Sequence, residues 1–193
     1  MTPRLLLSAY ASGAFPMADP EEGGTVYWYA PDPRAILPIN DFHIPKTLRR
    51  TVRRAPFDVK VNQSFEAVIR ACAEPGPGRE TTWISEELIE AYVGLHRHGF
   101  AHSVECWEAG RLVGGLYGVA LRGAFFGESM FHRATDASKV ALVHLVERLR
   151  AGGFVLHDVQ FTTPHLARFG AIEIPKPAYE DRLAAALEVE AVF

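Results

Sequence analysis

The stretch Phe154-Val155-Leu156-His157-Asp158-Val159-Gln160-Phe161 sets the fold expected for this chain. Its apolar and β-branched residues follow two glycines and precede Pro164, which predicts a short buried strand. Successive strand side chains point to opposite faces, so Asp158 and Gln160 are expected on the face of Phe154 and Leu156. Such polar groups at the end of an apolar strand are costly unless they are paired. They indicate either a hydrogen-bonded strand end or a reaction centre.

The residues before this strand predict the rest of its sheet. Alternating apolar residues predict strands at 103–107, 112–121 and 124–130, and Asp136 begins a helix that runs to about Ala151. A helix that returns the chain to a new strand requires a crossover, so the last two strands are expected to lie parallel. We therefore predict an α/β (α+β) protein: a small mixed N-terminal domain, residues 1–60, and a larger domain, residues 61–193. The larger domain is expected to hold a mixed, partly parallel sheet flanked by helices.

Helical spacing of apolar residues and turn chemistry predict the remaining elements. Helices are expected at residues 2–13, 45–54, 64–73, 86–99 and 179–189, and further strands at 26–29, 35–37 and 57–61. Residues 15–20 are expected to form a loop, 31–34 a turn, and 74–78 an irregular, mobile loop.

The composition of the 193 residues is that of an ordinary globular protein, with 48% hydrophobic and 22% charged residues. No apolar run could span a bilayer and the N-terminus lacks a signal-peptide layout, so a cytoplasmic protein without membrane contact is expected. Cys72 and Cys106 sit among apolar neighbours, which favours reduced core cysteines. The net charge of −3 gives no global reason to expect nucleic acid.

Five cations are concentrated on one predicted helix. Their spacing places them within an arc of roughly 140°, and no acid lies between His43 and Pro56. These residues are Lys46, Arg49, Arg50, Arg53 and Arg54. A solvated face is the plain interpretation, but such faces usually mix both signs of charge. Phosphate backbone is the favoured partner, because arginine forks match phosphate oxygens.

No signature of a metal or a bound cofactor is present, and none is expected. His96, His98 and His102 lack the partners and the spacing of a metal set. Neither a dinucleotide-binding nor a nucleoside-triphosphate loop occurs. Glu128, in contrast, follows the apolar run 124–126, where an unpaired acid would be expensive. It could converge with Asp158 on one cleft, or belong to a structural hydrogen-bond network.

Several short motifs occur together in a characteristic order. They are Gly13-Ala14-Phe15-Pro16, Trp28 with Pro31-Asp32-Pro33-Arg34, Thr82-Trp83-Ile84, His102-Ser103-Val104-Glu105, Gly114-Gly115-Leu116-Tyr117-Gly118, Gly127-Glu128-Ser129-Met130-Phe131, Ala137-Ser138-Lys139, Asp158-Val159-Gln160, and Gly170-Ala171 with Ile174-Pro175. Over nearly the whole chain this series closely resembles the bacterial leucyl/phenylalanyl-tRNA–protein transferases.

The resemblance implies transfer of leucine or phenylalanine from aminoacyl-tRNA to proteins beginning with arginine or lysine, which serves the N-end rule pathway of degradation. It also implies a GNAT-like C-terminal domain without coenzyme A, and a monomer is expected. Two other classes stay open from the sequence: a coenzyme A-dependent GNAT acetyltransferase, and a non-catalytic RNA-binding protein on the same fold.

The resemblance also assigns roles to individual positions. Asp158 and Gln160 match a catalytic pair and Glu128 the acid of the same site, with Asp158 either orienting or deprotonating the attacking amine. Trp83 matches a position near the 3′-terminal adenosine. Leu116, Phe125, Met130 and Leu142 match substrate-binding positions, and the basic helix matches the region that faces the tRNA acceptor stem. Two residues depart from the usual pattern: Met17 replaces a tryptophan, and His157 replaces an aliphatic residue.

Overall fold

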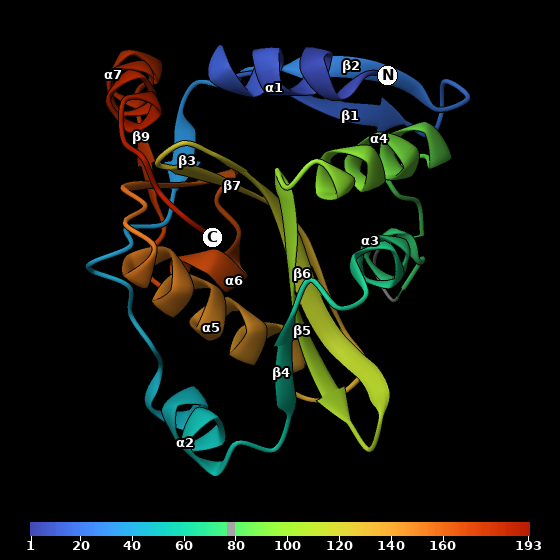
Figure 1. Ribbon diagram of the computed structural model, residues 1–193, viewed down its shortest axis with the longest axis vertical. Coiled ribbons are helices and arrows are strands. Elements are labelled where there is room, and N and C mark those ends of the chain that lie inside the picture. Colours follow the sequence, from blue (N-terminus) through green and yellow to red (C-terminus); the bar gives the residue numbers. More distant parts are fainter. Residues whose placement is uncertain (77–79) are drawn as a thin grey trace.

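A seven-stranded sheet forms the centre of the computed structural model, which describes residues 1–76 and 80–193 (Figure 1). Its strands run in the order β4-β5-β6-β7-β8-β3-β9. They are β3 (Arg34–Ile36), β4 (Asp58–Val61), β5 (Ala101–Glu108), β6 (Arg111–Leu121), β7 (Ala124–His132), β8 (Leu156–Gln160) and β9 (Ile172–Ile174). Part of the loop expected at 74–78 lies outside the described residues.

The predicted parallel pair is present at the centre of this sheet. β7 and β8 run parallel, whereas the other neighbouring strands pair antiparallel. The connection between β7 and β8 is α5 (Ala137–Ala151), which supplies the crossover that a parallel pair requires. The expected α/β class with a mixed, partly parallel sheet is confirmed.

Helices cover both faces of the sheet, and each face has its own core. Figure 1 shows α3 (Phe65–Ala73) and α4 (Glu86–Arg97) on one side and α5 on the other. Strand alternation divides the side chains between them: Tyr117 joins the core under α3 and α4, and Leu116 joins the core under α5. The helix α2 (Lys46–Arg54) packs on the α5 side through Leu48.

The N-terminal residues form α1 (Pro3–Ala11) and a separate hairpin. β1 (Phe15–Asp19) pairs antiparallel with β2 (Thr25–Tyr29), and Pro16 lies opposite Trp28. The prediction of a loop at residues 15–20 is therefore wrong. Proline lacks a backbone donor and is therefore found on edge strands, and both strands of a two-stranded sheet are edge strands.

Three elements near the end of the chain complete the fold. α6 (Pro164–Ala167) and β9 were not predicted, and α7 (Lys176–Leu187) begins three residues earlier than expected. Pro177 is tolerated there because the first turn of a helix needs no backbone donor at that position. β3 lies between β8 and β9, so strands from both sides of residue 60 share one sheet. The division of the chain at residue 60 stays a prediction.

Within the described residues, none of the helices has the length and apolarity needed to cross a bilayer.

Candidate active site

A cavity of about 290 Å³ lies beside β7 and β8, and six of the eight expected catalytic and substrate-binding residues line it. Its lining includes Trp83, Leu116, Met130, Leu142, Glu128 and Gln160. The structure thus places apolar side chains, together with the carboxyl group of Glu128 and the carboxamide of Gln160, around one cavity. These residues come from β6, β7, β8, α5 and the segment before α4.

Phe125 lies behind this cavity and is absent from its described lining. Its side chain has no exposed surface, and its ring lies 5.6 Å from the ring of His157, centroid to centroid. The two residues are register partners on β7 and β8, and His157 is the one that reaches the cavity. Phe125 therefore supports the cavity wall from the core.

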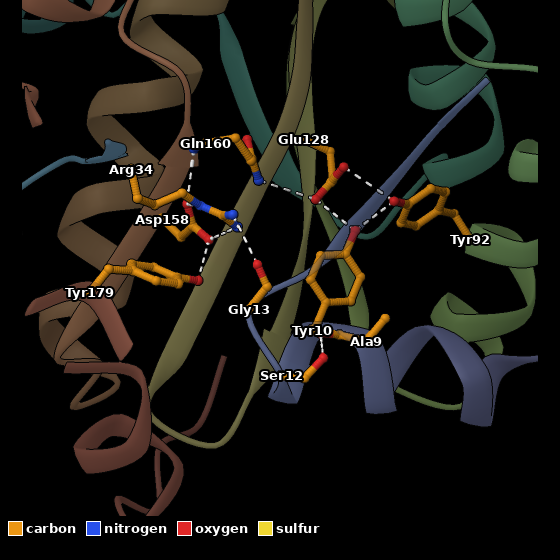
Figure 2. A network of polar contacts seen from close by, with 10 residues as sticks. All are labelled: Ala9, Tyr10, Ser12, Gly13, Arg34, Tyr92, Glu128, Asp158, Gln160 and Tyr179. Atoms are coloured by element: carbon orange, nitrogen blue, oxygen red, sulfur yellow. Dashed lines mark hydrogen bonds and ion pairs between the residues drawn. The ribbon is translucent and has the colours of Figure 1, made fainter. Parts of the chain in front are cut away.

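Asp158 also lies behind the cavity, with all of its bonding capacity used by the protein (Figure 2). Its Oδ1 accepts hydrogen bonds from Arg34 Nε at 3.0 Å and from the Gln160 amide at 2.9 Å. Its Oδ2 accepts from Arg34 Nη2 at 2.6 Å and from the Tyr179 hydroxyl at 2.7 Å. These four hydrogen bonds satisfy both oxygens of a fully buried carboxyl group and fix its orientation.

Arg34 is the cation that makes this buried carboxylate possible. Only 1% of its surface is exposed, and its guanidinium lies 4.6 Å from the ring centroids of both Phe15 and Tyr179. Its Nη1 donates to the Gly13 carbonyl oxygen at 2.9 Å. Burial alone would lower the pKa of Arg34, but hydrogen bonding and attraction to Asp158 raise it above the ordinary value. Arg34 therefore stays protonated beside Asp158.

Gln160 reaches the cavity through an unusual backbone conformation. Its φ of +60° lies in the left-handed region, which costs a residue with a side chain roughly 1–2 kcal/mol. The hydrogen bond from its amide to Asp158 holds this conformation. The left-handed turn ends β8, and as a result the cavity receives Gln160 but not Asp158.

Glu128 lies between two tyrosines at the cavity wall. Tyr10 donates to Oε1 at 2.7 Å and Tyr92 donates to Oε2 at 3.1 Å, while Gln160 Nε2 approaches Oε1 at 3.4 Å (Figure 2). Burial raises the pKa of Glu128 to about 7, although the two tyrosine hydrogen bonds oppose that shift. A carboxyl group with this pKa exchanges a proton readily near neutral pH.

Comparison with known proteins identifies the family of this chain. The family model for leucyl/phenylalanyl-tRNA protein transferase matches residues 36–184, and the model for the N-terminal domain of the same family matches residues 1–32. The chain belongs to this family.

Individual leucyl/phenylalanyl-tRNA–protein transferases are similar over the whole chain. The protein from Salinibacter ruber is 58% identical over 189 residues, which cover 98% of this chain and 81% of the relative. The protein from Paramagnetospirillum magneticum is 58% identical over 193 residues, which cover 100% and 92%. The resemblance inferred from the motifs is confirmed.

A solved structure shares the fold at low sequence identity. L-PGS from Bacillus licheniformis aligns with a TM-score of 0.50 and 12% identity, covering 81% of this chain and 65% of that chain. This likeness shows the fold alone, and it agrees with the GNAT-like architecture expected for this transferase.

The basic helix of the transferase is α2, and its five cations are all exposed. Leu48 is buried beneath it, and Ile44 and Val52 are partly buried. None of the five cations pairs with an acid in the part of the chain that the structure describes. This face therefore remains available for an anion.

Metal binding and cysteine chemistry were also considered for residues 1–76 and 80–193. No group of three or more histidine, cysteine or acidic side chains is arranged to hold a metal ion there. Cys72 and Cys106 are both buried and form no disulfide, and burial raises the pKa of Cys106 to about 12.

Sequence reasoning missed four residues of the site: Tyr10, Arg34, Tyr92 and Tyr179. Arg34 was placed in a turn, and the tyrosines lie on α1, α4 and α7, where helical spacing does not indicate a polar partner. Their partners lie between 21 and 124 positions away in the chain. The one available signal was the free-energy cost of burying Glu128 and Asp158. That cost indicated that each carboxyl group needs hydrogen-bond partners, but not which residues supply them.

Proposed function

We propose that this protein transfers leucine or phenylalanine from aminoacyl-tRNA to the α-amino group of proteins that begin with arginine or lysine. Membership of the leucyl/phenylalanyl-tRNA protein transferase family supports the reaction class and both substrates. Marking proteins for N-end rule degradation in the cytoplasm, as a monomer, is the physiological setting that we propose. The aminoacyl ester is already activated, so the transfer needs neither ATP nor a bound cofactor.

The proposal rests on a cavity that has an apolar wall and a polar end. Leu116, Met130 and Leu142 offer an apolar wall for the donor side chain, and Glu128 with Gln160 offers the polar end. An ester held between them would present its carbonyl carbon to an incoming amine. Positioning of this kind supplies much of the rate of a bimolecular transfer.

Glu128 is the proton acceptor in the mechanism that we propose. The α-amino nitrogen attacks the ester carbonyl, the C–N bond forms, and the C–O bond to the tRNA ribose breaks. One amine proton must leave and the ribose oxygen must gain one. An α-ammonium has a pKa of about 7.7–8, close to the raised pKa of Glu128 at about 7, so this carboxyl group can carry the proton. Its charge would also attract the acceptor's cationic side chain.

Asp158 acts as a positioning residue in this proposal. Both of its oxygens already accept two hydrogen bonds, and the described cavity lining does not include it. It holds the backbone of Gln160, whose carboxamide then orients the ester and Glu128. Of the two roles left open by the sequence, orientation is the one that this geometry supports.

The basic helix supplies the tRNA contact that we propose. Lys46, Arg49, Arg50, Arg53 and Arg54 would bind the phosphates of the acceptor stem, and Trp83 would stack near the terminal adenosine at the cavity. Five phosphate contacts would make binding strongly dependent on salt.

The decisive experiment measures transfer of labelled leucine from Leu-tRNA to a peptide that begins with arginine. The wild-type protein is expected to be active, Glu128→Gln and Asp158→Ala to be strongly impaired, and Asp181→Ala, an exposed aspartate on α7, to match wild type. Full activity of Asp158→Ala would show that the site is misassigned. Acetyl transfer from acetyl-coenzyme A, or tRNA binding without transfer, would favour one of the two other classes.

A further inference from the structure

His157 is a buried polar side chain that the protein does not satisfy. It lies on β8 with 2% of its surface exposed, it lines the cavity, and its Nδ1 has no hydrogen-bond partner. The contacts of the ring are apolar: Phe125 packs against it edge to face, and Nε2 lies close to Gly127. A buried hydrogen-bonding group without a partner costs about 1–3 kcal/mol, so this ring calls for an explanation.

The sheet places His157 at the apolar end of the cavity. Its register partner Phe125 belongs to the core under α5, which also contains Leu116 and Leu142. Glu128, in contrast, bonds to Tyr10 and Tyr92 on the other side of the sheet. The imidazole therefore lies where the donor side chain would sit, away from the proton-transfer end.

The imidazole of His157 fits beside β7 and is neutral, so it can form a hydrogen bond with an uncharged ligand. A methyl group on Gly127 would come within 3.1 Å of Nε2, so a glycine at that position lets the imidazole approach β7. Burial lowers the pKa of His157 to about 3, which keeps the ring neutral at physiological pH. A neutral imidazole offers one N–H donor and one acceptor nitrogen.

We infer that His157 gives the donor pocket a hydrogen-bonding position, and that the protein accepts donor side chains of phenylalanine's size that carry a terminal hydroxyl group. Tyrosine is the natural test of this class. The inference rests on the proposed transfer function and extends its donor range. The neutral ring can accept a hydrogen bond from the tyrosyl hydroxyl or donate one to the tyrosyl oxygen.

The physical basis is the different treatment of a hydroxyl by apolar and polar pockets. A purely apolar pocket rejects an added hydroxyl only about a hundredfold. A partner for that hydroxyl removes most of the desolvation cost and reduces the rejection further. The wild-type protein should therefore discriminate against tyrosine less than an apolar pocket would.

The test uses one tRNA body charged with phenylalanine or tyrosine, so that only the side chain differs. Transfer to an arginine-initiated peptide is measured for the wild-type protein, His157→Leu and His157→Gln. The ratio of kcat/KM for tyrosine to that for phenylalanine should fall about tenfold in His157→Leu, and His157→Gln should restore much of it. His144→Leu, a change on α5 outside the cavity, should keep the wild-type ratio.

A second measurement does not depend on turnover. Non-hydrolysable amide analogues of tyrosyl- and phenylalanyl-adenosine are titrated calorimetrically into each variant, and the same loss of relative tyrosine affinity is expected in His157→Leu. Equal ratios in wild type and His157→Leu in both measurements would overturn the inference, because water rather than the donor would then pair with the ring. A wild-type protein that transfers no phenylalanine would instead overturn the proposed function, and this inference with it.

Discussion

Arg34 and Asp158 form a two-pronged buried ion pair, although 124 positions separate them in the chain. Arg34 comes from β3, near the N-terminal hairpin, and Asp158 comes from the neighbouring strand β8. The pair joins the N-terminal residues to the strand that ends at Gln160. Its geometry therefore determines where the carboxamide of Gln160 enters the cavity.

Arg34→Lys should impair transfer mainly through kcat. Lysine keeps the charge but cannot form two parallel bonds to Asp158, so Gln160 loses its fixed position. We expect a loss of about 1–3 kcal/mol in the free energy of unfolding, with kcat reduced more than KM is raised. Urea denaturation and steady-state kinetics measure the two effects. Arg122→Lys, in the exposed pair with Glu190, is the control and should change the stability by less than about 0.5 kcal/mol.

Tyr179→Phe removes one donor from Asp158 without changing the packing of the ring around Arg34. The bond to Oδ2 is 2.7 Å long and buried, so we expect about 1–2 kcal/mol of lost stability and a several-fold lower kcat. Tyr27→Phe removes an exposed hydroxyl that bonds to Glu22 and provides the matched comparison. Equal behaviour of the two variants in thermal unfolding and in transfer would contradict the positioning role of Tyr179.

The pH dependence of transfer should reveal Glu128. Its pKa is raised to about 7, so the ionised form needed to accept a proton is lost as pH falls below that value. In the wild type, kcat/KM should fall with a slope approaching two at low pH, because the acceptor amine also becomes protonated. Glu128→Gln should lower kcat/KM about a hundredfold or more and reduce that slope to one. A slope that is unchanged in Glu128→Gln would exclude this carboxyl group as the base.

Acid stability should depend on His157. Its pKa is lowered from 6.5 to about 3, so between these values the unfolded chain binds a proton that the folded chain does not. The free energy of unfolding must therefore fall as pH drops below 6.5, by about 2 kcal/mol at pH 5. Urea titrations at pH 8 and pH 5 should show that His157→Leu loses less stability than the wild type. Taking the difference between the two proteins cancels the opposite contribution of Glu128, whose pKa is raised.

Charge reversal on α2 should weaken tRNA binding. Arg49→Glu with Arg53→Glu places two acids on the exposed face of the helix, and the dependence of binding on salt should become shallower by about two phosphate contacts. Filter binding at several salt concentrations measures both quantities. Arg97→Glu with Arg182→Glu makes the same change of charge at two exposed sites on α4 and α7. Equal binding by these two double variants would rule out α2 as the tRNA surface.

The periodic elements of this protein were predictable because their signals are local. Helical spacing predicted α2, α3, α4 and α5, and the helix between two buried strands required the parallel pairing of β7 and β8. Glu128, Asp158 and Gln160 stood out for a local reason as well, since each is a polar residue within or directly after an apolar run of the sequence. The series of short motifs indicated the family.

The features that could not be predicted from the sequence share one cause: they depend on contacts between distant residues. β1 has five residues and β9 has three, and each forms because a partner strand lies beside it. Segments this short have too little periodicity to predict that pairing. Phe125 and Leu116 looked equivalent as apolar strand residues, yet only Leu116 reaches the cavity. Access to a cavity depends on which neighbouring side chain covers a residue.

The fold class, the crossover, the basic helix and the identity of the three polar residues follow from local sequence, because periodicity, capping and the cost of burying charge act over a few neighbouring positions. The role of each polar residue depends on contacts between distant parts of the chain. Arg34, Tyr179 and the Gln160 amide use up the bonding capacity of Asp158, and burial raises the pKa of Glu128 to about 7. Long-range pairing sets desolvation and hydrogen bonding at a carboxylate, and these two quantities determine whether it holds its charge or takes up a proton.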